Sequence, residues 1–141
     1  MKLDLTSLAD SITSLREGIE VVSDEPWFNA QPKAVQSTLI AGVIQNFEFV
    51  YEISLKMMRR RIEMDAASPS EADFSDFRGL LRTAAEKGLI ADVEAWFEYR
   101  QMRNLTSHTY DRGKARKVYE GTKRFIDDAE ALLRALMERN V

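Results

Sequence analysis

The chain contains no cysteine, a single histidine, and little glycine or proline. Without cysteine there can be no disulfide, thiolate metal site or cysteine nucleophile, and one histidine excludes a metal centre built from several imidazoles. Six glycines and three prolines in 141 residues leave too few turn positions for an all-β fold, which needs a turn about every 8–12 residues. The composition therefore favours long helices.

Long apolar runs are missing as well. No segment approaches the roughly 18 uncharged apolar residues of a membrane span, and the first residues, MKLDLTSLADSIT, lack the basic and apolar regions of a secretory signal. A chain of 141 residues, 45% of them hydrophobic, can form one domain of common size but not two. We therefore expect a single domain over residues 1–141, in the cytoplasm and without membrane association.

Charge is unevenly distributed along the chain. The formal net charge of −3 argues against a nucleic-acid partner, yet residues 99–124 contain eight basic residues against two acidic ones, Asp111 and Glu120. Such a run is usually a solvated helix face; the alternative is a basic site for a phosphate-bearing partner. The basic residues are Arg100, Arg103, Arg112, Lys114, Arg116, Lys117, Lys123 and Arg124.

Apolar residues recur at helical spacing in five segments. They predict helices over about residues 4–23, 33–65, 70–87, 93–110 and 114–139, with a loop over 24–32. Ser70 to Asp73 resembles an N-terminal cap, Gly88 a C-terminal one, and Asp92 can cap the fourth helix. Because short connections join long amphipathic helices, the predicted fold is all-α, an antiparallel up-and-down bundle of about five helices.

Two acidic pairs give weak signals. Glu48 and Glu52, one helical turn apart, could imitate a carboxylate metal pair, but no histidine lies nearby in the sequence and an ordinary helix face is the favoured interpretation. Asp127 and Asp128 are predicted to be solvated surface. No phosphate-binding loop, dinucleotide fingerprint or helix-turn-helix signature is present. We expect no metal and no cofactor.

The only histidine, His108, lies in a polar segment from Arg103 to Tyr110. A lone histidine near a helix end is more often stabilised by the helix dipole than catalytic. On a continuous helix Arg103 and His108 diverge by about 140°. They can meet at one phosphate only if the helix ends or distorts there, or if a second chain contributes. Acid–base cleavage of a phosphodiester uses two proton carriers, so one histidine per chain favours the second chain.

Three stretches in unbroken order, residues 43–64, 77–91 and 102–112, resemble the HepT-type branch of the HEPN superfamily, also described as nucleotidyltransferase substrate-binding proteins. The last stretch contains an Arg-x4-His-x-Tyr motif. The resemblance implies a HEPN-type helical bundle over residues 1–141 that forms a homodimer, with both motifs near the interface in a basic cleft. The chain departs from the family pattern at Leu55 and Asn46. Both positions lie outside the motif, so they affect the expected fine specificity and not the motif chemistry.

The resemblance also implies a function. Family members are toxins of type VII toxin–antitoxin pairs, metal-independent endoribonucleases that cleave RNA. Each is encoded beside a small nucleotidyltransferase antitoxin of the MntA type, which adds AMP to the motif tyrosine.

Carried over to this chain, the motif gives each residue a role. Arg103 and His108 are the candidate catalytic residues, Asn104 supports the site, and Tyr110 is the AMP acceptor. Arg103 would bind the phosphate and stabilise developing charge, and His108 would act as base or acid. The candidate residues for binding RNA phosphates are Arg100, Arg112, Lys114 and Arg116.

A second hypothesis belongs to a different class of protein. A non-catalytic substrate-binding or adaptor subunit of a nucleotidyltransferase would use the same basic cleft to bind phosphate without cleaving it. The presence of Arg103 and His108 in one chain favours the nuclease, because an adaptor has no need of a proton carrier.

Overall fold

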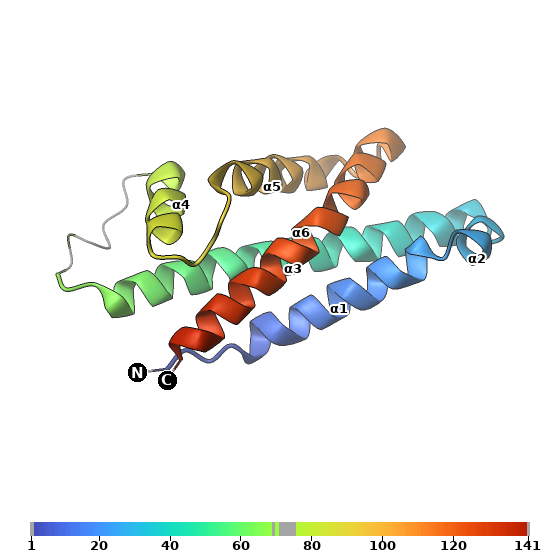
Figure 1. Cartoon of the computed structure of the whole chain (residues 1–141). Helices are drawn as coiled ribbons and strands as arrows, with labels where there is room; N and C mark the ends of the chain where they lie inside the picture. Colours follow the sequence, from blue (N-terminus) through green and yellow to red (C-terminus); the bar gives the residue numbers. More distant parts are fainter. Residues whose placement is uncertain (1, 69, 71–75, 141) are drawn as a thin grey trace.

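The computed structural model describes residues 2–68, 70 and 76–140, and every regular element in this part of the chain is a helix (Figure 1). This confirms the predicted all-α fold. The elements are α1 (Thr6–Ser23), α2 (Glu25–Asn29), α3 (Lys33–Asp65), α4 (Phe77–Glu86), α5 (Val93–Leu105), the 3₁₀ turn η2 (Thr106–His108) and α6 (Arg112–Arg139). None of these helices is long and apolar enough to cross a membrane.

The three longest helices, α1, α3 and α6, pack along one another, and α3 runs the length of the molecule (Figure 1). Helix α2 closes the tight connection between α1 and α3. Helix α5 lies beside α3 and α6, whereas the short α4 lies across α3. The chain ends meet, since the side chain of Asn140 donates to the Leu3 carbonyl and accepts from the Leu3 amide, both at 2.8 Å.

A cluster of aromatic rings holds α3, α5 and α6 together. The Phe125 ring is in edge contact with Phe47, Trp96 and Tyr99, with centroid distances of 4.8, 5.8 and 4.9 Å. All four side chains are buried. Edge-to-face packing of this kind adds to the apolar burial, and deleting one such ring costs about 3–5 kcal/mol. The cluster fixes the part of α5 that immediately precedes the sequence motif.

The predicted loop over residues 24–32 is wrong in part, because it contains α2. The Asp24 carboxylate accepts the amide of Trp27 at 3.4 Å, and Pro26 occupies the first turn, where its missing N–H has no partner to lose. A helix of five residues is too short to show an apolar period.

Helix α4 begins later than the predicted start at residue 70. Asp76 has extended backbone and its carboxylate accepts the Gly79 amide at 2.7 Å, so the helix starts at Phe77. The predicted cap at Ser70 to Asp73 falls largely outside the described residues.

The predicted end of this helix at Gly88 is confirmed. Gly88 has a φ of +77°, in the left-handed region that glycine adopts without steric cost. The Gly88 and Leu89 amides donate to the carbonyls of Ala85 and Ala84, at 3.0 and 2.9 Å. This is the Schellman arrangement of a helix C-terminus.

Candidate active site

The sequence motif lies where α5 ends, and this end comes earlier than predicted. The fourth helix was expected to continue to Tyr110, but α-helical geometry stops at Leu105 and a 3₁₀ turn follows over Thr106–His108. The Thr106 hydroxyl donates to the Arg103 carbonyl at 2.7 Å and the Ser107 hydroxyl to the Asn104 carbonyl at 3.4 Å. Such local side-chain bonds compete with the helix. The helix therefore distorts between Arg103 and His108.

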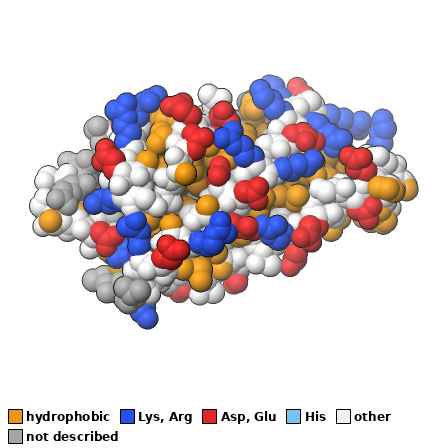
Figure 2. Space-filling view, viewed as in Figure 1, with side chains coloured by type: hydrophobic (Ala, Val, Ile, Leu, Met, Phe, Trp, Pro, Cys, Tyr) orange, Lys and Arg blue, Asp and Glu red, His pale blue; other side chains and the backbone are white. Residues whose placement is uncertain are grey.

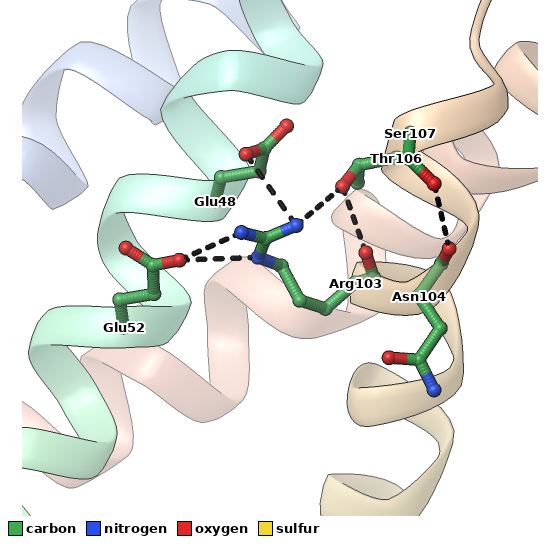
Figure 3. Close-up of polar contacts among 6 residues, drawn as sticks. All are labelled: Glu48, Glu52, Arg103, Asn104, Thr106 and Ser107. Carbon is green, nitrogen blue, oxygen red and sulfur yellow. Dashed lines mark hydrogen bonds and ion pairs between the residues drawn. The ribbon is translucent and has the colours of Figure 1, made fainter.

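Arg103 is anchored to α3 by two glutamates (Figure 3). Its Nε and Nη2 donate to Oε1 of Glu52 at 3.2 and 2.8 Å, and its Nη1 lies 3.6 Å from Oε2 of Glu48. Nη1 also donates to the Thr106 hydroxyl at 2.8 Å. The hydrogen bonds to Glu52 raise the pKa of the Arg103 guanidinium above its ordinary value. The side chain keeps one third of its surface exposed, 33%, although each of its three guanidinium nitrogens already has a partner.

This arrangement adds a role to the helix face predicted for Glu48 and Glu52. Their side chains are 30% and 56% exposed, and both carboxylates pair with Arg103. In the part of the chain that the structure describes, no three histidine or acidic side chains are grouped so that they could hold a metal ion.

His108 and Tyr110 form an exposed pair on the turn between α5 and α6. The His108 Nδ1 and the Tyr110 hydroxyl lie 3.4 Å apart, and the ring centroids are 6.0 Å apart at 72°. Tyr110 is 82% exposed, whereas Tyr51, Tyr99 and Tyr119 are buried. Within the described residues no hydrogen bond joins His108 to Arg103, so the two candidates occupy adjacent but separate positions.

Two of the buried tyrosines have hydroxyl groups with raised pKa values. Burial raises the pKa of the Tyr51 hydroxyl to about 12, although the nearby Arg100 and Arg103 lower it. Burial also raises the pKa of Tyr99, which donates to the carboxylate of Asp128. Asp128 is therefore half-buried and bonded, and its prediction as solvated surface is wrong.

Asn104 is not brought together with Arg103. Its amide points away from the guanidinium (Figure 3) and lines a groove between α5 and α6 with Met102, Leu105 and Lys117. Glu98, Gln101 and Gly121 complete the lining of this groove. The supporting role predicted for Asn104 needs a substrate or a second chain to reach it.

The candidate phosphate-binding residues separate into two places. Arg100 stacks over the Phe77 ring at 4.5 Å, on α5 before the motif. Arg112 and Arg116, in contrast, line a cavity at the start of α6. The exposed Lys114 lies between them in sequence and donates its backbone amide to Asp111. Figure 2 shows Lys and Arg side chains gathered over the end of the molecule where α6 begins.

Comparison with known proteins places this fold and motif in a family. Residues 3–138 match the family model described as nucleotidyltransferase substrate binding protein like. The chain belongs to this family. A Haemophilus influenzae protein named Probable ribonuclease HepT is 47% identical over 139 residues, covering 99% of this chain and 95% of that protein. The resemblance to HepT-type proteins is confirmed.

Solved structures agree with this assignment. One from Haemophilus influenzae, described as revealing the fold of a substrate binding domain of a nucleotidyltransferase, has 46% identity and a TM-score of 0.91, covering 95% of this chain and 99% of that one. A crystal structure from Thermus thermophilus, with 22% identity and a TM-score of 0.68 over 92% of this chain and 98% of that one, shares the fold.

For this member of the nucleotidyltransferase substrate-binding family, sequence reasoning missed three contributors to the site. Glu48, Glu52 and Thr106 hold the Arg103 guanidinium. A turn-spaced acidic pair was the available signal, but the sequence does not say which face of α3 meets α5. Thr106 carried no signal of its own beyond its helix-disfavouring hydroxyl.

Proposed function

We propose that the protein is a metal-independent endoribonuclease of the HepT kind, with Arg103 and His108 as its catalytic residues. The observation that carries the proposal is the exposed His108–Tyr110 pair, set on a turn directly after the anchored Arg103. The identity to the protein named Probable ribonuclease HepT supports it. The chemistry is attack of a ribose 2′-OH on the adjacent phosphate, whose nucleophile is already tethered.

Each residue has a defined part in this reaction. Arg103, which is partly exposed, exchanges one of its present partners for the scissile phosphate and stabilises the charge that develops there. The imidazole of His108 takes the proton of the 2′-OH or gives one to the leaving 5′-oxygen. Because one histidine does not serve as base and acid at once, each of two chains contributes its own histidine to the site.

The proposed assembly is therefore a homodimer in which the two 103–110 segments face each other. The exposed Phe49, next to Glu48 in the sequence of α3, is an apolar residue for a second copy to cover. Light scattering should give a two-fold dimer. A mass of 16.2 kDa at micromolar concentration would remove the shared-site mechanism.

The proposed regulation is AMP addition to Tyr110 by a small nucleotidyltransferase antitoxin of the MntA type, in a type VII toxin–antitoxin pair. Its 82% exposure supports Tyr110 as acceptor over the three buried tyrosines. Its hydroxyl is beside His108, so an added adenylyl group blocks the site by bulk and negative charge.

The decisive experiment for the nuclease follows cleavage of RNA by the purified protein with and without EDTA. Cleavage should persist in EDTA. The variant His108→Ala should lose about a hundredfold or more, as expected for loss of a proton-transfer group, while keeping its helical circular dichroism. If EDTA stops the reaction and magnesium restores it, the mechanism is wrong.

One observation favours the adaptor as second candidate. All three guanidinium nitrogens of Arg103 are already engaged by Glu52, Glu48 and Thr106, an arrangement that a merely structural arginine would also show. The description of the Haemophilus influenzae structure as a substrate binding domain points the same way. A protein that never cleaves RNA but binds a nucleotidyltransferase would establish this alternative.

A further inference from the structure

A cavity of about 380 Å³ lies between the end of α2, the first turns of α3 and the start of α6. Its volume falls in the roughly 300–1,000 Å³ range of small-molecule sites. Sequence analysis predicted two of its residues, Arg112 and Arg116, as phosphate ligands. The residues from α2 and α3 were not predicted, because nothing in the sequence shows that this end of α3 meets α6.

The cavity is cationic, and no ion pair within the described part of the chain engages its cations. Lys33, Arg112 and Arg116 line it, and none of its described lining residues is acidic. None of the ion pairs among the described residues involves these three side chains, although the Arg116 guanidinium lies 5.8 Å from the Tyr119 ring centroid. Three like charges around one hollow repel one another, and an anion relieves that repulsion.

The acidic side chains near these cations lie outside the cavity lining: Glu25 and Glu120 line an adjoining hollow with Arg116, and Glu120 pairs with Lys123. Another acidic residue, at the start of α6, is engaged by the helix itself. Asp111 caps α6, and its Oδ1 accepts the amides of Gly113 and Lys114 at 2.9 and 3.2 Å. It therefore compensates the helix terminus rather than the cavity cations.

The other walls offer what a nucleoside requires. Phe28 and Ile40 provide an apolar surface, and Asn29, Gln36 and Ser37 provide amide and hydroxyl groups. Bases pack on apolar or aromatic side chains and are recognised at their edges by hydrogen bonds. Phosphates are bound by Lys and Arg through charge-assisted hydrogen bonds. The combination matches a nucleotide better than a simple inorganic anion.

The cavity also adjoins the motif. Thr109 is one of its lining residues, and it stands between His108 and Tyr110 in the chain. A nucleotide in the cavity is thus next to the turn that carries both residues.

We propose that this cavity binds one nucleoside monophosphate unit, with Lys33, Arg112 and Arg116 around the phosphate and the base against Phe28 and Ile40. The role of this nucleotide rests on the proposed function. The nucleotide comes either from the RNA strand, next to the cleaved phosphate, or from the adenylyl group attached to Tyr110. Both sources present a base, a ribose and a phosphate in a diester.

Calorimetric titration with 5′-AMP and with adenosine tests the cavity directly, without any RNA cleavage. AMP should bind about tenfold or more tightly than adenosine, because only AMP reaches the cations. The double variant Lys33→Gln/Arg116→Gln should weaken AMP binding by about tenfold or more. The matched control Lys56→Gln/Arg134→Gln also removes one lysine from α3 and one arginine from α6, away from the cavity, and should change binding less than about twofold.

Equal weakening in both double variants, or no AMP binding at all, would overturn the proposal. Circular dichroism of each variant checks that the exposed substitutions leave the helices intact.

Two further measurements distinguish the sources. If the unit belongs to RNA, the cavity double variant raises KM for RNA about tenfold while kcat changes little. If it belongs to the modified tyrosine, protein carrying AMP on Tyr110 no longer binds free AMP. Unchanged KM together with undiminished AMP binding by the modified protein would refute both sources.

The two proposals fail separately. RNA cleavage of ordinary strength without AMP binding would reject the cavity and leave the nuclease. AMP binding in a protein that never cleaves RNA would reject both the nuclease and the RNA as the source of the nucleotide. The adenylyl group on Tyr110 would then be the remaining source, tested by AMP binding to the modified protein.

Discussion

Arg103 and the three cavity cations lie near the turn over residues 106–110, but they differ in whether acidic side chains pair with them. Arg103 is fixed by Glu48, Glu52 and Thr106, so its orientation is set but much of its charge is neutralised. Lys33, Arg112 and Arg116 line the cavity with no acidic neighbour in its described lining. A paired guanidinium is suited to meeting one phosphate in a defined geometry, whereas unpaired cations are suited to attracting a strand.

This division explains how an acidic protein can have a phosphate site. The net charge of −3 describes the whole surface, but the field near the turn depends on which cations are compensated locally. In the proposed site, attraction and positioning of the phosphate belong to different residues, so mutation can test the two functions separately.

The largest expected effect comes from removing the fixed cation. Arg103→Ala should lower kcat/KM for RNA by about a hundredfold or more, since a donor to developing charge is lost. Arg124 offers a matched control, because it also pairs with two carboxylates, Asp92 at 3.1 Å and Glu98 at 3.0 Å, but lies outside the motif. Arg124→Ala should leave cleavage unchanged. Similar losses of cleavage in both variants would mean that any loss of positive charge lowers the activity, which would contradict a specific role for Arg103.

A smaller effect is expected from removing the anchor while keeping the arginine. Glu48→Gln/Glu52→Gln should lower kcat about tenfold with little change in KM, because the guanidinium loses its orientation but not its charge. Unfolding free energy should change by less than about 1 kcal/mol, as for exposed ion pairs.

The corresponding control is Asp92→Asn/Glu98→Gln, which frees Arg124 in the same way. Faster cleavage in the Glu48/Glu52 variant would contradict this interpretation. It would mean that the two glutamates inhibit Arg103 by occupying it instead of orienting it.

Much of the helical framework follows from local sequence. Helix α1 follows from a predicted apolar stripe, of which four members are buried and two partly buried: Leu8, Ile12, Leu15 and Val22, then Leu5 and Ile19. The bounds predicted for α3 agree with Lys33–Asp65. Helix α2 escaped prediction because five residues show no period. The early end of α5 escaped because it depends on hydroxyl bonds of Thr106 and Ser107, which compete with a pattern that is typical of a continuous helix.

The site was predictable only in its motif. The family resemblance identified Arg103, His108 and Tyr110, whose spacing is visible in one stretch of sequence. The partners of Arg103 lie on α3, about fifty residues earlier, and Lys33 lies about eighty residues before Arg112. Such pairs depend on how helices cross, which side-chain packing decides and the sequence pattern does not encode.

The salt dependence of RNA affinity also distinguishes the cavity cations from Arg103, and the expected effect is smaller. Each single-stranded phosphate that the protein's cations neutralise contributes about 0.7 to the slope of log affinity against log salt. Because the cavity cations surround one phosphate, Lys33→Gln/Arg116→Gln should reduce the slope by about 0.7, so that between about 50 and 200 mM salt the unmodified chain loses about 2.6-fold more affinity than the variant. Fluorescence anisotropy with a 2′-O-methyl RNA, which lacks the nucleophile, measures this without cleavage.

Arg103→Ala should change that slope less than the cavity variant does, because Glu48 and Glu52 already compensate its charge. An equal change would show that the two cationic groups contribute alike to attraction.

The smallest effect on cleavage is expected at the turn itself. Tyr110→Phe removes a hydroxyl that is 82% exposed and only 3.4 Å from the His108 Nδ1, a distance at the long limit of hydrogen bonding. Cleavage by unmodified protein should therefore change by less than about threefold. After incubation with the partner nucleotidyltransferase and ATP, however, mass spectrometry should find AMP on the peptide containing Tyr110, and none on the phenylalanine variant. AMP on Thr106, Ser107 or Thr109 would keep the regulation but move the acceptor. AMP on Tyr110 with undiminished cleavage would mean that the adenylyl group does not reach the phosphate held by Arg103.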